Sequence, residues 1–204
     1  MADAQNRQIL LVSRPHGEAT VSNFRFVETP LAPLRDGEVR VRNHYLSLDP
    51  YMRGRMDDAK SYAAPQPLNE VMIGGTAGVV IESRNPAFEP GDSVVGTFGW
   101  QEYGTSDGRG LNKVDTSRVP LSAYLGAVGM PGVTAWYGLH HRTEGRRDGG
   151  RVGGERRGGH VVGQLAKAAG CRVVGIAGGE QKCRYVVDTL GFDALRRLQG
   201  GQAA

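Results

Sequence analysis

The 204-residue chain is poor in the residues that build metal centres and disulfide frameworks. Its two cysteines, Cys171 and Cys183, are too few for a disulfide framework and indicate a reducing compartment. They are also too few for a cysteine-rich zinc site, and the five histidines show no metal-ligand spacing. We therefore expect no bound metal. We interpret the histidines as solvated or structural side chains: His16, His44, His140, His141 and His160.

Long apolar runs are also missing. No stretch approaches the roughly 18 consecutive apolar residues of a transmembrane helix. Residues 1–7 lack the apolar core of a secretory signal peptide. The chain is 39% hydrophobic, 7% aromatic and 23% charged, which is ordinary for a soluble globular protein. We expect a cytoplasmic protein of one or two domains with no membrane contact.

Glycine and positive charge are abundant but unevenly distributed. The chain has 31 glycines and a net charge of +4. Residues 140–160 contain seven glycines, six arginines and three acidic residues, and 195–204 add two more arginines. Arginine clusters neutralise nucleic-acid phosphates, but 140–160 lacks the aromatic side chains on which bases stack. We therefore expect no nucleic-acid partner.

Residues 7–120 carry the signals of a β domain. Segments that alternate or cluster β-branched and aromatic residues are separated by Pro, Gly and Asp. Many short strands with frequent turns favour an antiparallel barrel or sandwich. The predicted strands are 7–13, 21–29, 38–48, 77–83 and 92–100.

Beyond Pro120 the apolar spacing becomes helical. Residues 121–129 predict one helical segment, Met-Pro-Gly interrupts it, and 133–139 predict another. Further along, a helix ending at Gly170, a buried parallel strand and a second helix are predicted. This helix, strand and helix are typical of part of a βαβ nucleotide-binding fold. They occupy 161–170, 171–179 and 180–191.

Three motifs carry a family resemblance: YLSLDPYMRGRM (45–56), GMPGVTAWYGL (129–139), and the segment from GQLAKAAG to GFDA (163–194). They closely resemble the zinc-free medium-chain dehydrogenases/reductases, in particular the NADP-dependent alkenal/one oxidoreductases. That subgroup includes prostaglandin reductase, leukotriene B4 12-hydroxydehydrogenase-like proteins and curcumin reductase. The resemblance covers about residues 5–139 and 161–194.

The resemblance implies an α+β protein of two domains. A GroES-like antiparallel β barrel would form 1–125, and an incomplete Rossmann α/β domain that binds NADPH would form 126–204. The implied reaction is hydride transfer from NADPH to the β-carbon of an α,β-unsaturated ketone or aldehyde, and the implied partner is a small enone. Zinc-dependent relatives carry a cysteine ligand in the β domain, whereas this β domain has no cysteine. Hydroxyl donors would then polarise the carbonyl. Whether the full-length family form is a homodimer stays open.

The expected phosphate loop is altered. The family places a loop of the type Ala-Ala-Ser-Gly-Ala-Val-Gly-Ser before VVGQLAK, where this chain reads GGERRGGH (153–160). Glycine is needed there so that backbone N–H groups can approach the pyrophosphate. Arg156 replaces the first essential glycine, while Gly159 and Gly163 remain as cofactor-binding candidates.

A frameshift explains this segment. Residues 140–160 can be back-translated into codons that, read one nucleotide later, encode TIGPKAGETVVVSAASGAVG, which contains the missing strand and loop. The residues after Ala194 similarly yield CVDYKAGK, which resembles the family's continuation. We hypothesise a compensated frameshift across 140–160 and an uncompensated one after Ala194 in a truncated chain. The alternative is a genuine Arg/Gly linker. Because a doubly wound sheet needs about six strands and only 171–179 is recognisable, we expect no stable nucleotide-binding domain.

The resemblance implies further cofactor contacts. Lys182 follows the second Rossmann strand, where a lysine would lie near the 2′-phosphate of NADP; the alternative is an exposed lysine at a helix start. Glu180 could instead be read as the acid that holds an NAD ribose. Met130 and Thr134 resemble positions beside the nicotinamide and phosphates. The alternative is that Met-Pro-Gly is only a structural break between helical segments.

Two tyrosines are the catalytic candidates. Tyr51 and Tyr62 resemble tyrosines that line the family's substrate cleft. A phenol hydroxyl there could donate a hydrogen bond to the enone oxygen as enolate charge develops. The alternative is that both pack at a domain edge. A second function therefore stays open, that of an inactive remnant with a folded β domain and no cofactor binding.

Overall fold

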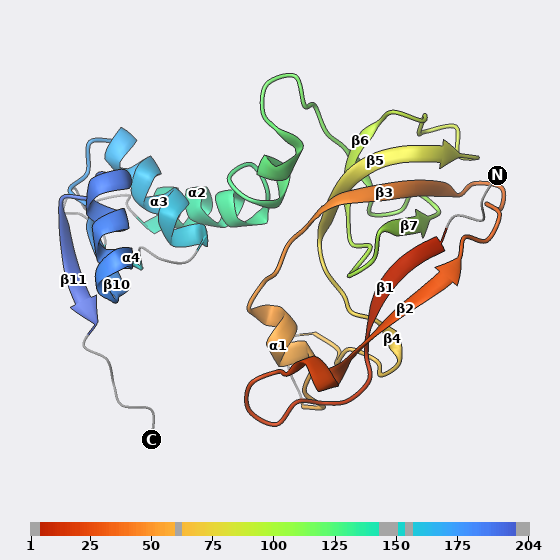
Figure 1. The fold of residues 1–204 in the computed structure, drawn as a ribbon. Helices are drawn as coiled ribbons and strands as arrows, with labels where there is room; N and C mark the ends of the chain where they lie inside the picture. Colours follow the sequence, from red (N-terminus) through yellow and green to blue (C-terminus); the bar gives the residue numbers. More distant parts are fainter. Residues whose placement is uncertain (1–4, 60–62, 143–150, 154–156, 199–204) are drawn as a thin grey trace. The chain divides into compact units, whose positions relative to one another are not determined.

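The computed structural model describes residues 5–59, 63–142, 151–153 and 157–198 (Figure 1). The chain divides into two compact units, Met1–Leu125 and Gly126–Ala204. Within the described ranges, no helix combines the length and apolar character needed to cross a membrane. Within the same ranges, no three His, Cys, Asp or Glu side chains gather as metal ligands would.

The first unit is built from two antiparallel sheets. One has the order β2-β1-β4, and the other has the order β7-β3-β5-β6-β8. Strands lie at all five segments where alternating or clustered β-branched and aromatic residues predicted them. The strands are β1 (Gln5–Leu11), β2 (Phe24–Pro30), β3 (Val39–Leu46), β4 (Glu70–Val71), β5 (Thr76–Ser83), β6 (Ser93–Gly96), β7 (Tyr103–Ser106) and β8 (Asn112–Lys113).

A closed barrel is not seen among the described residues of this unit. The two sheets are instead joined locally through the segment that follows β6. There the Ile9 N–H donates to the Trp100 carbonyl at 2.9 Å, and the Glu102 N–H donates to the Arg7 carbonyl at 3.0 Å. The predicted strand 92–100 ends at Gly96, because the chain then leaves the ladder to make these contacts.

Two apolar clusters hold the first unit together. The larger lies on one face of the five-stranded sheet, between valines of β3, β5 and β6 and Leu111. The other packs the short helix α1 (Tyr51–Arg55) against the three-stranded sheet. Burying each such side chain contributes about 1.5–3 kcal/mol. The members of the second cluster are Leu11, Met52, Met56 and Met72, with Phe24, Tyr51, Ile73 and Trp100 at its edge.

Helix α2 begins earlier than the sequence predicted. The segment predicted as helical over 121–129 forms only a 3-10 turn, η2 (Leu121–Leu125), and α2 runs over Met130–Arg142. The Met-Pro-Gly segment is therefore the first turn of α2 and not a break before it. Proline suits that position because its missing N–H would have no partner in a first helical turn.

The second unit contains a parallel sheet of three strands with the order β11-β10-β9. The predicted strand is confirmed as β10 (Val174–Gly178), and the predicted helix before it is α3 (Arg157–Ala168). Gly170 has a φ of 77°, the left-handed conformation that ends a helix. The second helix divides into α4 (Glu180–Arg184) and a π turn, η3 (Tyr185–Thr189).

The sheet has two strands beyond the one that the sequence made recognisable. β9 (Arg151–Gly153) and β11 (Ala194–Leu198) pair with β10 on its two sides, and both belong to segments interpreted as out of frame. Val174 lies opposite Arg151 in one ladder and opposite Ala194 in the other. A strand ladder uses main-chain N–H and C=O groups, which every residue except proline provides. Segments of Arg and Gly can therefore pair without side chains that favour strands.

The core of the second unit forms where α3 and η3 cover this sheet. Its buried members are Ala166, Val173, Ala177, Val186 and Phe192. The Phe192 side chain is 3% exposed and lies against the backbone of two glycines, Gly163 of α3 and Gly175 of β10. Phe192 of the GFDA segment therefore packs against both α3 and β10 and connects the helix to the strand.

Candidate functional site

The carboxyl end of β10 forms the first part of the candidate site. Open α/β sheets bind ligands at the carboxyl ends of their strands. Here β10 ends at Gly178, Gly179 follows with a φ of 75°, and α4 begins at Glu180. Lys182 is exposed on α4, within the first five residues after the strand. This is the placement that the sequence predicted for a cofactor-binding lysine.

A cavity of about 270 Å³ lies beside Lys182. Its other lining residues are His160 of α3, Gln181 of α4, and Tyr185 and Val186 of η3. The rings of His160 and Tyr185 are tilted against each other with centroids 5.5 Å apart. The walls of the cavity are almost wholly apolar, which suits a flat apolar group, and Lys182 is one of the residues that line it.

Sequence reasoning missed His160 and Tyr185 as lining residues. His160 was interpreted as solvated or structural, and nothing near it in the sequence indicates Tyr185. The spacing of 181 and 185 by one helical turn was the only available signal. Glu180, the alternative acid, forms an ion pair with Arg184 four residues later. Its carboxylate is therefore already engaged on the surface of α4.

The two candidate glycines of α3 have different surroundings. Gly159 lies in the first helical turn and is half-buried. Backbone N–H groups in such a turn have no helical partner and favour a negatively charged ligand. Gly163 is buried one turn later, where a Cβ would overlap the Phe192 ring. Its lack of a side chain allows α3 to approach Phe192 closely, so the structure explains Gly163 by packing.

Asp193 fastens the same helix to the sheet. Its carboxylate accepts hydrogen bonds from the Lys167 ammonium and the Val173 N–H, both at 2.7 Å. The Lys167 ammonium and the Val173 N–H together hold the pKa of Asp193 below its ordinary value. The end of α3 is thereby tied to the residue that precedes β10, which keeps the lining residues of the cavity on connected elements.

Met130 and Thr134 lie on α2, one turn apart on the same helix face. Met130 begins the helix and is 63% exposed, and Thr134 is also exposed. Neither is among the residues that line the Lys182 cavity. The structure therefore places Lys182 and His160 at one cavity, and Met130 and Thr134 do not line it.

Tyr51, a catalytic candidate, lies in the first unit. It is the first residue of α1, is half-buried, and packs at the edge of the cluster around Met52 and Met72. The second candidate, Tyr62, lies outside the described residues. The segment after it is tied to α1, because Arg55 Nε donates to the Ala64 carbonyl at 3.0 Å.

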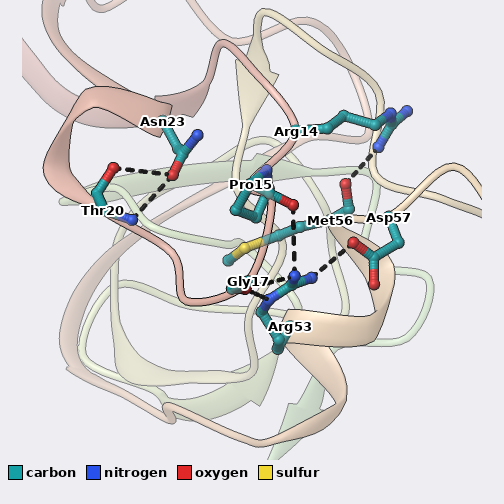
Figure 2. Close-up of polar contacts among 8 residues, drawn as sticks. All are labelled: Arg14, Pro15, Gly17, Thr20, Asn23, Arg53, Met56 and Asp57. Carbon is teal, nitrogen blue, oxygen red and sulfur yellow. Dashed lines mark hydrogen bonds and ion pairs between the residues drawn. The ribbon is translucent and has the colours of Figure 1, made fainter. Parts of the chain in front are cut away.

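Arginines hold the other side of α1 (Figure 2). Arg53 donates to the Gly17 carbonyl from Nε at 3.0 Å and from a terminal nitrogen at 2.7 Å. It also forms an ion pair with Asp57 at 2.7 Å. Arg14 reaches across from the same loop as Gly17 and donates to the Met56 carbonyl at 2.8 Å. The loop between β1 and η1 (Val21–Asn23) is therefore bound to the helix that carries Tyr51.

Comparison with known proteins points to one family. Residues 7–114 match the family described as the N-terminal domain of oxidoreductase. The chain is 46% identical over 191 residues to an NADPH-dependent curcumin reductase of Escherichia coli, covering 93% of this chain and 55% of that protein. It is 42% identical over 188 residues to a prostaglandin reductase 1 of Rattus norvegicus, covering 87% of this chain and 53% of that protein.

A solved structure agrees with these relatives. CurA of Vibrio vulnificus in complex with NADPH is 44% identical and superposes with a TM-score of 0.88. The match covers 96% of this chain and 58% of the CurA chain. The chain thus spans about half the length of the curated relatives it matches.

Proposed function

Since this chain belongs to the NADP-dependent alkenal/one oxidoreductases, a family of medium-chain dehydrogenases/reductases with a GroES-like N-terminal domain, we propose that it serves the reduction of enones. The reaction is the NADPH-dependent reduction of the C=C bond of α,β-unsaturated ketones and aldehydes. The observation that carries the proposal is the position of Lys182, beside an aromatic cavity at the carboxyl end of β10. Family relatives are named for NADPH-dependent reduction, which agrees with that position.

The second unit would hold NADPH. Its residues fit one end of that cofactor, because two aromatic rings line a cavity at the carboxyl end of β10 and Lys182 is another of its lining residues. Lys182 would bind the 2′-phosphate, and the free N–H groups around Gly159 would face the pyrophosphate. Met130 and Thr134 would lie beside the nicotinamide and phosphates, and Gly163 would keep α3 in place. When bound, NADPH supplies the hydride that the β-carbon receives.

The first unit would hold the enone. A hydroxyl group of Tyr51 or Tyr62 would donate a hydrogen bond to the carbonyl oxygen of the substrate. Negative charge grows on that oxygen as the β-carbon is reduced, so the hydrogen bond is stronger in the transition state than in the ground state. The tyrosine thereby lowers the barrier without a metal ion.

The test compares NADPH with NADH, which lacks the 2′-phosphate. Replacing Lys182 removes one charge-assisted hydrogen bond, worth about 1.5–3 kcal/mol. We expect Lys182→Gln to weaken NADPH binding roughly tenfold to a hundredfold and to leave NADH binding unchanged, as measured by the fluorescence of the bound nucleotide.

Arg184→Gln is the matched control, because it removes the same charge from the same helix. Arg184 is paired with Glu180 and does not line the cavity. We expect it to change the affinity for both nucleotides less than threefold. Equal loss of NADPH affinity in the two variants would show that only the overall charge of α4 matters and would contradict the assignment of Lys182.

A specific observation favours the second candidate function, an inactive remnant with a folded β domain. The positions of the phosphate loop read GGERRGGH, with Arg156, which lies outside the described residues, in place of a glycine. An arginine side chain there obstructs the close approach of backbone to pyrophosphate. If the purified chain shows no saturable NADPH binding and no enone-dependent NADPH oxidation, this second function is the correct one.

A further inference from the structure

The helix that carries Tyr51 is too short to be stable without contacts from the rest of the chain. α1 has five residues, whereas isolated helices need about 12–15 residues to be even marginally stable in water. Its orientation is therefore set by contacts with its surroundings. On one side these are apolar, through the buried Met52 and Met56. Apolar contacts are not directional, so they leave small rotations and shifts of α1 unopposed.

Arg53 supplies the directional contacts on the other side (Figure 2). The planar guanidinium group presents five N–H donors in a fixed arrangement. Two of its nitrogens meet the Gly17 carbonyl, one of them lies 3.4 Å from the Pro15 carbonyl, and the third nitrogen meets Asp57. Arg53 thus makes most of the side-chain hydrogen bonds between α1 and the loop, and Arg14 adds one more at the Met56 carbonyl.

The loop that accepts these bonds is itself restrained. Gly17 has a φ of 79°, a conformation that side-chain-bearing residues rarely adopt. At the far end of the loop, the Thr20 N–H donates to Asn23 Oδ1 at 2.8 Å, and Asn23 Nδ2 donates to Ser13 Oγ at 3.0 Å. Asn23 thus connects the two ends of the loop that presents the Pro15 and Gly17 carbonyl groups to α1.

We propose that Arg53 is a positioning residue for Tyr51, acting through its fork of hydrogen bonds to the Pro15 and Gly17 carbonyls. This proposal rests on the proposed function, in which the Tyr51 hydroxyl donates to the enone oxygen. Without the fork, α1 retains its apolar anchors and the hydrogen bonds at its C-terminal end, from Arg14 and Arg55, but the first turn, which carries Tyr51, shifts. A misplacement of about 1 Å can cost a reaction roughly a hundredfold in rate. Arg53 has no contact with the substrate in this role.

Two substitutions test the hydrogen-bond fork of Arg53 and its positive charge separately. Arg53→Lys keeps a positive charge that can reach Asp57, but one ammonium nitrogen cannot reproduce a planar fork on two carbonyl groups. Asp57→Asn removes the ion pair and leaves the fork intact. If Arg53 positions α1 through its fork, Arg53→Lys resembles Arg53→Met, and Asp57→Asn resembles the unchanged chain.

The test uses the full chain labelled with 3-fluorotyrosine. The 19F resonance of Tyr51 is assigned as the peak that disappears in Tyr51→Phe. We expect Arg53→Met and Arg53→Lys to shift or broaden this resonance, and to speed amide exchange at Met56 and Asp57 at least tenfold. Asp57→Asn and the surface control Arg84→Gln should leave both readouts unchanged. An unmoved Tyr51 resonance in folded Arg53→Met overturns the proposal, as does full rescue by Arg53→Lys.

A kinetic measurement separates this inference from the proposed function. If the chain reduces enones, Arg53→Met should lower kcat at least tenfold while the Kd of NADPH changes less than twofold, because NADPH would bind in the second unit. Unchanged kcat with faster exchange in the loop would overturn a positioning role. If the unchanged chain reduces no enone, the proposed function has failed, and the 19F and exchange results alone decide whether Arg53 sets the place of Tyr51.

Discussion

Gly163→Ala tests whether this glycine serves packing or cofactor binding. A Cβ at residue 163 would lie 2.8 Å from Cε2 of Phe192 and closer still to Cζ and Cε1. Carbon atoms in contact normally lie about 3.5–4.0 Å apart, so the ring or the helix must move. Phe192 is buried among Val173, Val186 and neighbouring side chains, which leaves the ring little room.

The magnitude follows from two opposing effects. Replacing glycine by alanine inside a helix stabilises it by about 1 kcal/mol. Overpacking a well-packed core costs about 1–3 kcal/mol. Gly138 of α2 is the matched control, because a Cβ there meets no atom within 4 Å. Both substitutions share the first effect, so the unfolding free energies of the two variants should differ by about 1–3 kcal/mol.

The assay is thermal unfolding followed by circular dichroism at 222 nm, which reports mainly on α2 and α3 of the second unit. A domain of 60–100 residues changes its Tm by about 4–8 °C per kcal/mol. We expect Gly138→Ala to raise Tm, and Gly163→Ala to melt roughly 5–20 °C below Gly138→Ala. Adding Phe192→Leu to Gly163→Ala should recover part of this loss, because a smaller side chain relieves the overlap. If Gly163→Ala is as stable as Gly138→Ala, the packing explanation is wrong.

Two further predictions concern the same unit. Asp193 has a lowered pKa in the folded chain, so its contribution to stability is present above about pH 4 and is lost as the pH falls through that lower pKa. Asp193→Asn should therefore destabilise the second unit at pH 7, and the difference from the unchanged chain in urea unfolding should shrink towards pH 2–3; a constant difference would contradict the linkage. Replacing GGERRGG (153–159) by AASGAVG, which leaves His160 in place, should tighten NADPH binding at least tenfold and reduce its dependence on salt, since a shaped backbone cradle replaces diffuse arginine charge. Unchanged affinity in a fluorescence titration would show that these residues are not the missing phosphate loop.

Several elements could be predicted from local sequence patterns. The five predicted strands of the first unit alternate or cluster β-branched and aromatic residues between turn residues, and Gly170 ends α3. Both signals depend only on neighbours in the chain. The position of Lys182 beyond β10 was also predictable, since it follows from the family motif. The start of α2 was not, because Met-Pro-Gly suits either a helix break or a first helical turn.

The candidate site was likewise only partly predictable from the sequence. His160 and Tyr185 line a cavity with Lys182 although they are far apart in the sequence, and no periodicity connects them. Gly163 was predicted as a cofactor glycine from the family motif, and its close approach to the Phe192 ring is visible only in the structure. The hydrogen bonds of Arg53 to the loop could not be predicted from the sequence, because its main acceptors are backbone carbonyl groups, and every residue carries such a group.

The sequence by itself determined the family, the apolar faces of the strands and helices, and the loss of the expected glycine at Arg156. These follow from side-chain identity and spacing along the chain. Only the tertiary structure decided that β9 and β11 flank β10, that Gly163 accommodates Phe192, and that Arg53 binds the loop to α1. The physical reason is that main-chain hydrogen bonds and close packing depend on which segments come together in space. The pattern of side chains along either segment does not show which other segment it will contact.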